Sequence, residues 1–337
     1  MQLTNKTPYQ AERAVTMDKD AAENLIVAVK GTWAFAEGGG LELAVDQSPI
    51  ALMDEYGGEP ATTSIVQAFE LGFPKPSTDV AMVGHAYARR RGTRQAEVTL
   101  RAGPIRKTVR VTGRRRWVSS FGFPRATKPE PFTSIPLIWE NCYGGSDPEA
   151  KAWEPCNPVG RGFRGKKSKI PWKDTELPNI EHPKRTLAKP GDKSIPWGLG
   201  FVAPFWEPRR SRAGTYDAAW LEGTAPLLPA DFQETFHHSV PDDQVAPQRF
   251  RGGEEIEVNG VGETGRLRGQ VPRQFPVATV FFQRAIKGMA LPLDTVVIDA
   301  DAGELRLLWK GVINVHRQVL KIRDIRVTLA AAHGNGS

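Results

Sequence analysis

The sequence predicts a mainly β protein, in which antiparallel, sandwich-like sheets from both chain ends flank a long ordered irregular segment. Short runs rich in β-branched and aromatic residues, separated by Gly, Pro or Asp, lie near both ends. Few windows keep a 3.6-residue apolar period for three turns, so few and short helices are expected. The middle of the chain holds most of the prolines and six of the nine tryptophans.

The first predicted unit is an N-terminal β-rich region, residues 1–120. Residues 24–35 read NLIVAVKGTWAF, which is typical of a strand, and three glycines at 38–40 turn the chain into a second short run, 41–45. The simplest interpretation is a hairpin. Further runs separated by Gly or Pro extend the same antiparallel system, namely 78–87, 96–102 and 105–112.

The second unit, residues 121–251, is predicted to be irregular and nevertheless ordered. Disordered segments avoid Trp, and large buried rings can hold a loop still. Rigid loops of this kind suit recognition. The aromatic residues expected to keep the segment in shape or to stand at an interface are Trp117, Trp139, Tyr143, Tyr216 and Trp220.

The third unit is a C-terminal β-rich region, residues 252–330, which is expected to pack with the first as one compact unit. Its apolar runs are 277–282, 293–299, 305–313 and 319–329, and the sequence DADAG at 299–303 supplies a turn. Residues 331–337 are expected to be a disordered tail.

Composition predicts a cytoplasmic protein that needs no cofactor or metal. The residues after Met1 are polar, and no apolar run is long enough to cross a membrane. The two cysteines, Cys142 and Cys156, are too few for a disulfide framework and have no zinc spacing. We expect them to be reduced and structural.

Positive charge is concentrated in residues 89–128. This stretch holds thirteen Lys or Arg against one acid, Glu97, a local charge of +12, so the rest of the chain carries 7 − 12 = −5. Residues 105–112 alternate apolar and polar, which is typical of a strand with one wet face, and the same stretch can serve as a partner surface. The arginines proposed to meet a partner are Arg89, Arg90, Arg91, Arg94, Arg114, Arg115 and Arg116.

Two fragments imitate ligand sites. Residues 160–167, GRGFRGKK, have the spacing of a phosphate-binding loop, but Lys167 stands where a hydroxyl residue is needed to hold magnesium. His237 and His238 are adjacent, so on regular structure their side chains diverge and do not share a metal ion. We therefore expect residues 160–167 to form a basic surface loop, and His237 and His238 to have separate roles.

Other residues imitate a hydrolase with a site in segment 136–245. Cys142 would need a histidine such as His85 or His316 brought close by the fold, and a buried structural cysteine is the favoured interpretation. A pair of carboxylates beside tryptophans would suit sugar hydrolysis. Turn and cap roles are preferred for these acids, which are Asp217, Asp231, Asp242 and Asp243. An enzyme is therefore not expected.

Taken together, a series of short blocks resembles the family labelled domain of unknown function 2169. The blocks follow the family's order along nearly the whole chain. They are NKTPY at 5–9, VKGTW at 29–33, KPSTDV at 75–80, GRRRW at 113–117, PLIWENCYGG at 136–145, NPVGRGF at 157–163, GTYDAAW at 214–220, PLLPADF at 226–232, PDDQ at 241–244, RGGE at 251–254 and LWKG at 308–311.

The resemblance implies a type VI secretion adaptor or chaperone that binds a toxic effector and helps seat it on the VgrG and PAAR spike. The expected partners are a PAAR-domain or VgrG-linked effector and VgrG itself, without a membrane and without catalytic residues. Three alternatives stay open: a nucleic-acid binder using residues 89–128, a hydrolase, and a structural part of the secretion apparatus. Nucleic acid is disfavoured because the basic run has no recognition helix and no interleaved aromatics.

Overall fold

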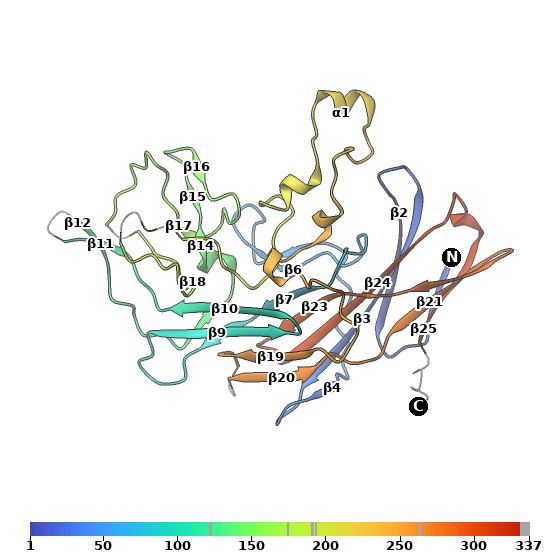
Figure 1. The fold of residues 1–337 in the computed structure, drawn as a ribbon, viewed down its shortest axis with the longest axis horizontal. Helices are drawn as coiled ribbons and strands as arrows, with labels where there is room; N and C mark the ends of the chain where they lie inside the picture. Colours follow the sequence, from blue (N-terminus) through green and yellow to red (C-terminus); the bar gives the residue numbers. More distant parts are fainter. Residues whose placement is uncertain (121–122, 174, 190–191, 193, 263–264, 331–337) are drawn as a thin grey trace.

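The computed structural model describes the chain except residues 121–122, 174, 190–191, 193, 263–264 and 331–337. The tail expected at 331–337 therefore lies outside the described residues. The prediction of a mainly β fold is confirmed, because the described chain forms several mostly antiparallel sheets and few short helices (Figure 1).

A six-stranded sheet combines strands from both ends of the chain. Its path runs through β2 (Gln10–Met17), β3 (Glu23–Phe35), β24 (Glu304–Asn314), β23 (Leu293–Asp299) and β7 (Asp79–Val83), and β4 (Leu41–Leu43) pairs with β3 as the predicted hairpin. Only β23 and β7 run parallel.

Strand β3 is apolar almost throughout because both faces of this sheet are covered. Leu25, Val27 and Val29 enter the main core, whereas Ile26 and Ala28 enter a second apolar cluster on the opposite face. The alternation of side chains along a strand therefore feeds two cores from one segment.

A four-stranded sheet lies at the end of the molecule that carries both termini (Figure 1). Its order is β1 (Gln2–Asn5), β25 (Ile322–Leu329), β21 (Pro276–Phe282) and β22 (Ile286–Ala290). Strands β1 and β25 are parallel, and the other neighbours are antiparallel.

A five-stranded sheet contains the basic strands. Its order is β18 (Ile180–Glu181), β10 (Ile105–Thr112), β9 (Gln95–Ala102), β19 (Glu255–Asn259) and β20 (Arg266–Gln270). The alternation predicted for 105–112 is confirmed, with one face buried. Lys107 lies on that buried face because its ammonium pairs with Asp243 at 2.8 Å and lies over the ring of Trp197 at 4.3 Å.

The middle of the chain consists mainly of loops that contain a short α-helix, 3₁₀ turns and two- to four-residue strands. Its α-helix is α1 (Ala218–Gly223), and 3₁₀ turns occupy Trp139–Asn141, Arg210–Ala213, Glu234–His237 and Asp242–Gln244, with one more at Val319–Lys321 near the C-terminus. The remaining strands are β5 (Glu55–Tyr56), β6 (Ile65–Gln67), β8 (His85–Tyr87), β11 (Trp117–Ser120), β12 (Phe123–Ala126), β13 (Ser134–Pro136), β14 (Tyr143–Gly144), β15 (Ser146–Asp147), β16 (Ala152–Trp153) and β17 (Arg161–Gly162).

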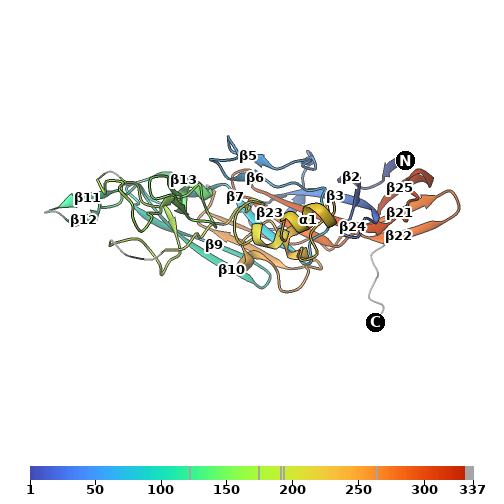
Figure 2. The same cartoon turned by 90° about the horizontal axis from the view of Figure 1, so that it is seen from above.

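The main core runs from Tyr9 to Val327 and includes residues of every predicted unit. At one point Tyr9, Trp33 and Trp309 pack with ring centroids 5.3 to 6.0 Å apart. Gly31 makes room for this packing, because a Cβ there would stand 2.5 Å from the ring of Trp33. Seen from above, the molecule is long and shallow (Figure 2).

Candidate protein-binding site

Residues 214–232, here called the arm, stand out from the body of the protein (Figure 1). Asp231 closes the base of the arm by accepting hydrogen bonds from the Thr215 backbone N–H at 2.9 Å and its hydroxyl at 2.8 Å. Gly214 has a φ of 87°, and a Cβ on it would lie 2.8 Å from the Asp231 carboxylate. The close approach of the two ends therefore requires glycine at this position.

The interior of the arm is held by its own contacts. Asp217 caps α1 by accepting from the Trp220 backbone N–H at 2.8 Å, and the Trp220 indole Nε1 donates to the Leu227 carbonyl at 2.9 Å. The ring of Tyr216 meets that of Trp220 edge to face at 4.7 Å. Cap, indole bond and ring pair together give the arm a defined shape without help from the sheets.

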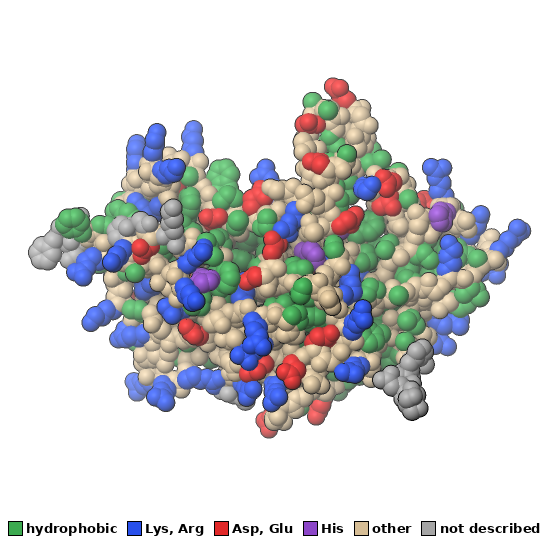
Figure 3. Space-filling view, viewed as in Figure 1, with side chains coloured by type: hydrophobic (Ala, Val, Ile, Leu, Met, Phe, Trp, Pro, Cys, Tyr) green, Lys and Arg blue, Asp and Glu red, His purple; other side chains and the backbone are tan. Residues whose placement is uncertain are grey.

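The arm presents apolar and acidic side chains to solvent. Leu221 is 65% exposed and Tyr216 is 52% exposed. All charged residues between 214 and 232 are acids, namely Asp217, Glu222 and Asp231. Figure 3 shows acidic and hydrophobic side chains side by side on the arm. A rigid projection whose tip exposes an apolar side chain beside an acidic one is suited to insertion into a partner surface.

His237 lies under the arm among aromatic rings. Its ring centroid is 5.8 Å from that of Phe73, 5.5 Å from Phe232 and 6.0 Å from Phe236. Burial, helped by the nearby positive charges of Lys310 and Arg209, lowers the pKa of His237 to about 4. The base of the arm is therefore packed around a neutral imidazole at neutral pH.

The arginines expected to contact a partner have different environments. Arg89 and Arg94 are exposed, and Arg90 and Arg91 line a hollow of about 510 Å³ beside Phe132. These four remain candidate contacts.

The three arginines at 114–116 do not form a single patch, which corrects the expectation. Arg114 is exposed and pairs with Glu176 at 2.7 Å, and Arg116 is exposed. Arg115 is only 8% exposed, and its guanidinium donates to Glu181 at 2.5 Å and to the Pro178 carbonyl at 2.9 Å. Arg115 is therefore a buried link between segments and not a contact residue.

The other aromatic candidates are internal. Trp117 is buried and meets Trp172 edge to face at 5.4 Å, and half-buried Tyr143 packs beside this pair. Trp139 is buried and meets Trp206 at 5.9 Å. The sequence placed these residues in one group with Tyr216 and Trp220, whereas only the latter two belong to the projecting arm.

The structure assigns packing roles to Cys142 and to the glycine-rich loop. Cys142 is fully buried, its Sγ lies 3.6 Å from the Ile138 carbonyl, and burial raises the pKa of the thiol to about 12. A buried protonated thiol is a poor nucleophile. In the loop at 160–167, a Cβ on Gly160 would stand 2.7 Å from the Cys142 carbonyl, so close backbone approach accounts for that glycine.

The acids considered for a hydrolase are each engaged in a structural contact. Asp217 caps α1 and Asp231 closes the arm, as described above. Asp242 receives the guanidinium of Arg212 at 2.7 Å, and Asp243 pairs with Lys107. Asp217 and Asp231 thus have the expected cap and turn roles, whereas Asp242 and Asp243 make ion pairs instead.

A buried ionic cluster was missed by sequence reasoning. Asp79 accepts from His238 Nδ1 at 2.6 Å and pairs with Lys75 at 2.7 Å, while Asp294 lies 3.4 Å from Lys310. Although burial opposes ionisation, Lys75 and His238 hold the pKa of Asp79 at about 2. The cluster ties the irregular middle segment to β7, β23 and β24. Its signal in the sequence was a lysine within apolar runs, as in LWKG.

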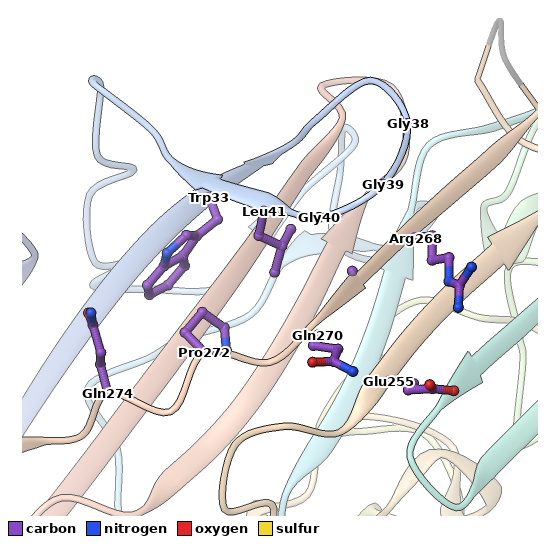
Figure 4. A pocket seen from close by; sticks show the side chains of 11 residues that line it. Trp33, Gly38, Gly39, Gly40, Leu41, Glu255, Arg268, Gln270, Pro272 and Gln274 are labelled. Carbon is purple, nitrogen blue, oxygen red and sulfur yellow. The ribbon is translucent and has the colours of Figure 1, made fainter. Parts of the chain in front are cut away.

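A groove between the hairpin loop at 38–40 and strand β20 was also not anticipated. It has a volume of about 590 Å³ and is bordered by Trp33, Leu41, Arg268 and Gln270 (Figure 4). Glu255 and Gln274 complete its polar rim. The sequence spacing of these residues does not predict that they lie together, because they come from two different sheets.

The described residues lack two further kinds of feature. They contain no group of three His, Cys, Asp or Glu side chains placed to hold a metal ion. In the same part of the chain, no helix has the length and apolarity needed to span a membrane.

Comparison with known protein families places this chain. No curated protein and no solved structure matches this chain. One family model, described as an uncharacterized protein conserved in bacteria (DUF2169), matches residues 20–310. That range holds the arm, the buried ionic cluster, the groove and most strands of the sheets. The chain thus belongs to the DUF2169 family.

Proposed function

We propose that this protein is a non-catalytic adaptor of the type VI secretion system, which binds an effector and helps load it on the VgrG and PAAR spike. The class of partner comes from the resemblance of its sequence blocks to such adaptors. The observation that carries a binding function is the arm, because Leu221 at its tip is exposed on an internally ordered projection.

The order of the arm is what suits it to binding. A segment that must fold on its partner loses affinity to the ordering of its side chains. In the arm, Trp220 is already fixed by an indole hydrogen bond and Tyr216 by ring contact. Binding through this element therefore requires little further ordering.

The direct test is co-purification of the tagged protein with each neighbouring gene product. Size-exclusion chromatography with light scattering, at low and high salt, gives the stoichiometry of any complex. A stable complex with a PAAR-bearing or VgrG-linked effector is expected. Recovery with nucleic acid alone, with affinity falling steeply as salt rises, would instead indicate the nucleic-acid alternative. A partnerless monomer in every combination would contradict the proposal.

Within that complex, Leu221→Asp should weaken effector capture about tenfold or more, because a charge replaces an apolar contact in a desolvated interface. Leu320→Asp is the matched control, since Leu320 is 96% exposed and lies outside the arm. The dissociation constant and the thermal midpoint are measured for both variants. Equal capture by the two variants would remove the arm from the interface.

A further inference from the structure

The free edge of β20 points its backbone groups into the groove. At the end of the β19–β20 hairpin, the Gly260 N–H donates to the Gly265 carbonyl at 2.9 Å. Hydrogen-bonded and non-hydrogen-bonded pairs alternate along an antiparallel ladder. Counting from this pair, the backbone N–H and C=O groups of Leu267 and Gly269 point toward β19, whereas those of Arg268 and Gln270 point outward. The Arg268 carbonyl agrees with this, because it accepts the Gly40 N–H from the outer side at 3.0 Å.

The groove begins beside this hydrogen bond, which joins the hairpin loop at 38–40 to the edge of β20. Residues 38–40 carry no side chains and have φ angles of 86°, 100° and 107°, which lets the loop lie against the edge of β20. Beyond Gly40 the hairpin and β20 separate, and the space between them is the groove of about 590 Å³ (Figure 4). The outward N–H groups of Arg268 and Gln270 and the Gln270 carbonyl are left at its border.

Charge on the outer face of the sheet indicates what the groove accepts. Arg106, Arg101, Glu257 and Arg268 stand opposite one another across four neighbouring strands. Glu257 is shared by two other arginines, lying 4.0 Å from Arg101 and 3.1 Å from Arg266. Among the described residues, no carboxylate pairs with the side chain of Arg268. A carboxylate on an added strand would supply that cross-strand partner.

We propose that an extended segment of a partner polypeptide, carrying Asp or Glu, adds to β20 as a new strand in this groove. Main-chain hydrogen bonds to Arg268 and Gln270 would hold the segment, and its carboxylate would meet the Arg268 guanidinium. The inference rests on the proposed function only for the partner's identity, namely the effector. Binding of an extended peptide itself is independent of that identity.

The test uses the full chain and a phage-displayed library of random linear peptides. Selected peptides are expected to alternate apolar and polar residues and to include an acid. Gln270→Pro should weaken them about tenfold by removing one outward N–H, whereas Gln270→Ala keeps that N–H and should bind as the wild type. The proline leaves the β19–β20 ladder in place, because the lost N–H points away from β19.

The charge is tested separately with Arg268→Glu, which should also weaken the peptides about tenfold. Its control is Arg323→Glu, which makes the same charge change on β25. Hydrogen exchange of the wild type with the best peptide should slow at the amides of residues 266–270, a readout that stands even if Gln270→Pro fails to fold. Failure to select any peptide, or binding indifferent to these substitutions with unchanged exchange at 266–270, overturns the inference. Neither result bears on whether the effector co-purifies.

Discussion

Arg115 illustrates how burial separates residues that look equivalent in the sequence. Arg115→Ala leaves the Glu181 carboxylate buried without its cation, in a site where burial already raises the pKa of Glu181. Removing one partner of a buried pair costs about 3–5 kcal/mol of unfolding free energy. Urea denaturation should show that loss. Arg114→Ala, at an exposed ion pair, should change stability by less than about 1 kcal/mol.

The consequence for design is that reversing all three charges at 114–116 does not test partner binding. Such a variant would lose capture by unfolding. Reversal at Arg114 and Arg116 alone, with Arg115 kept, probes the surface. A loss below about 1 kcal/mol for Arg115→Ala would contradict the buried-link assignment.

The sequence pattern predicted which side chains face the core, but it did not predict the partners of the buried charged side chains. The alternation in β10 predicted which side chains face the core, but Lys107 follows the apolar pattern only because Asp243 and Trp197 receive it. Those partners come from loops distant in the chain. Asp79 and His238 likewise meet at 2.6 Å through a contact that local spacing does not encode.

At the scale of elements, the base of the arm should be sensitive to acid. His237 has a folded pKa of about 4, below its usual 6.5, so protons bind the unfolded chain preferentially. Its contribution to stability is complete above pH 6.5 and is lost as pH falls from 6.5 to 4. The loss amounts to about 3 kcal/mol.

His237→Phe isolates this contribution, because the phenyl ring keeps the contacts with Phe73, Phe232 and Phe236 and cannot titrate. Chemical denaturation of both proteins at pH 7 and pH 4.5 is the measurement. The stability difference between the variant and the wild type should move in favour of the variant at pH 4.5. A pH-independent difference would show that His237 is accessible to protons in the folded state.

Elements with strong local signals were predictable, whereas their pairing was not. The β3–β4 hairpin followed from an apolar run, three glycines and a second short run. The pairing of β3 with β24 joins residues nearly a whole chain apart, and no local turn determines it. The projection of the arm and the edge-to-edge groove likewise depend on how sheets pack. The proposed boundaries at 120, 251 and 330 stay predictions.

At the scale of the whole molecule, shared sheets should make unfolding cooperative. Strand β24 lies between β3 and β23 in the six-stranded sheet, and the main core includes residues from all three predicted units. Differential scanning calorimetry should give one transition whose calorimetric and van't Hoff enthalpies agree. Two resolved transitions would indicate separately folding domains.

The self-contained bonding of the arm also bears on how this protein can change. Its capping carboxylate, its closing carboxylate and the Tyr216–Trp220 ring contact all lie between residues 214 and 232, and the side chains of the tip residues Leu221 and Glu222 take no part in them. Substitutions at the tip therefore leave the sheets and the arm's own framework intact. If the arm binds a partner as proposed, substitutions at its tip can alter partner choice during evolution while the fold is maintained.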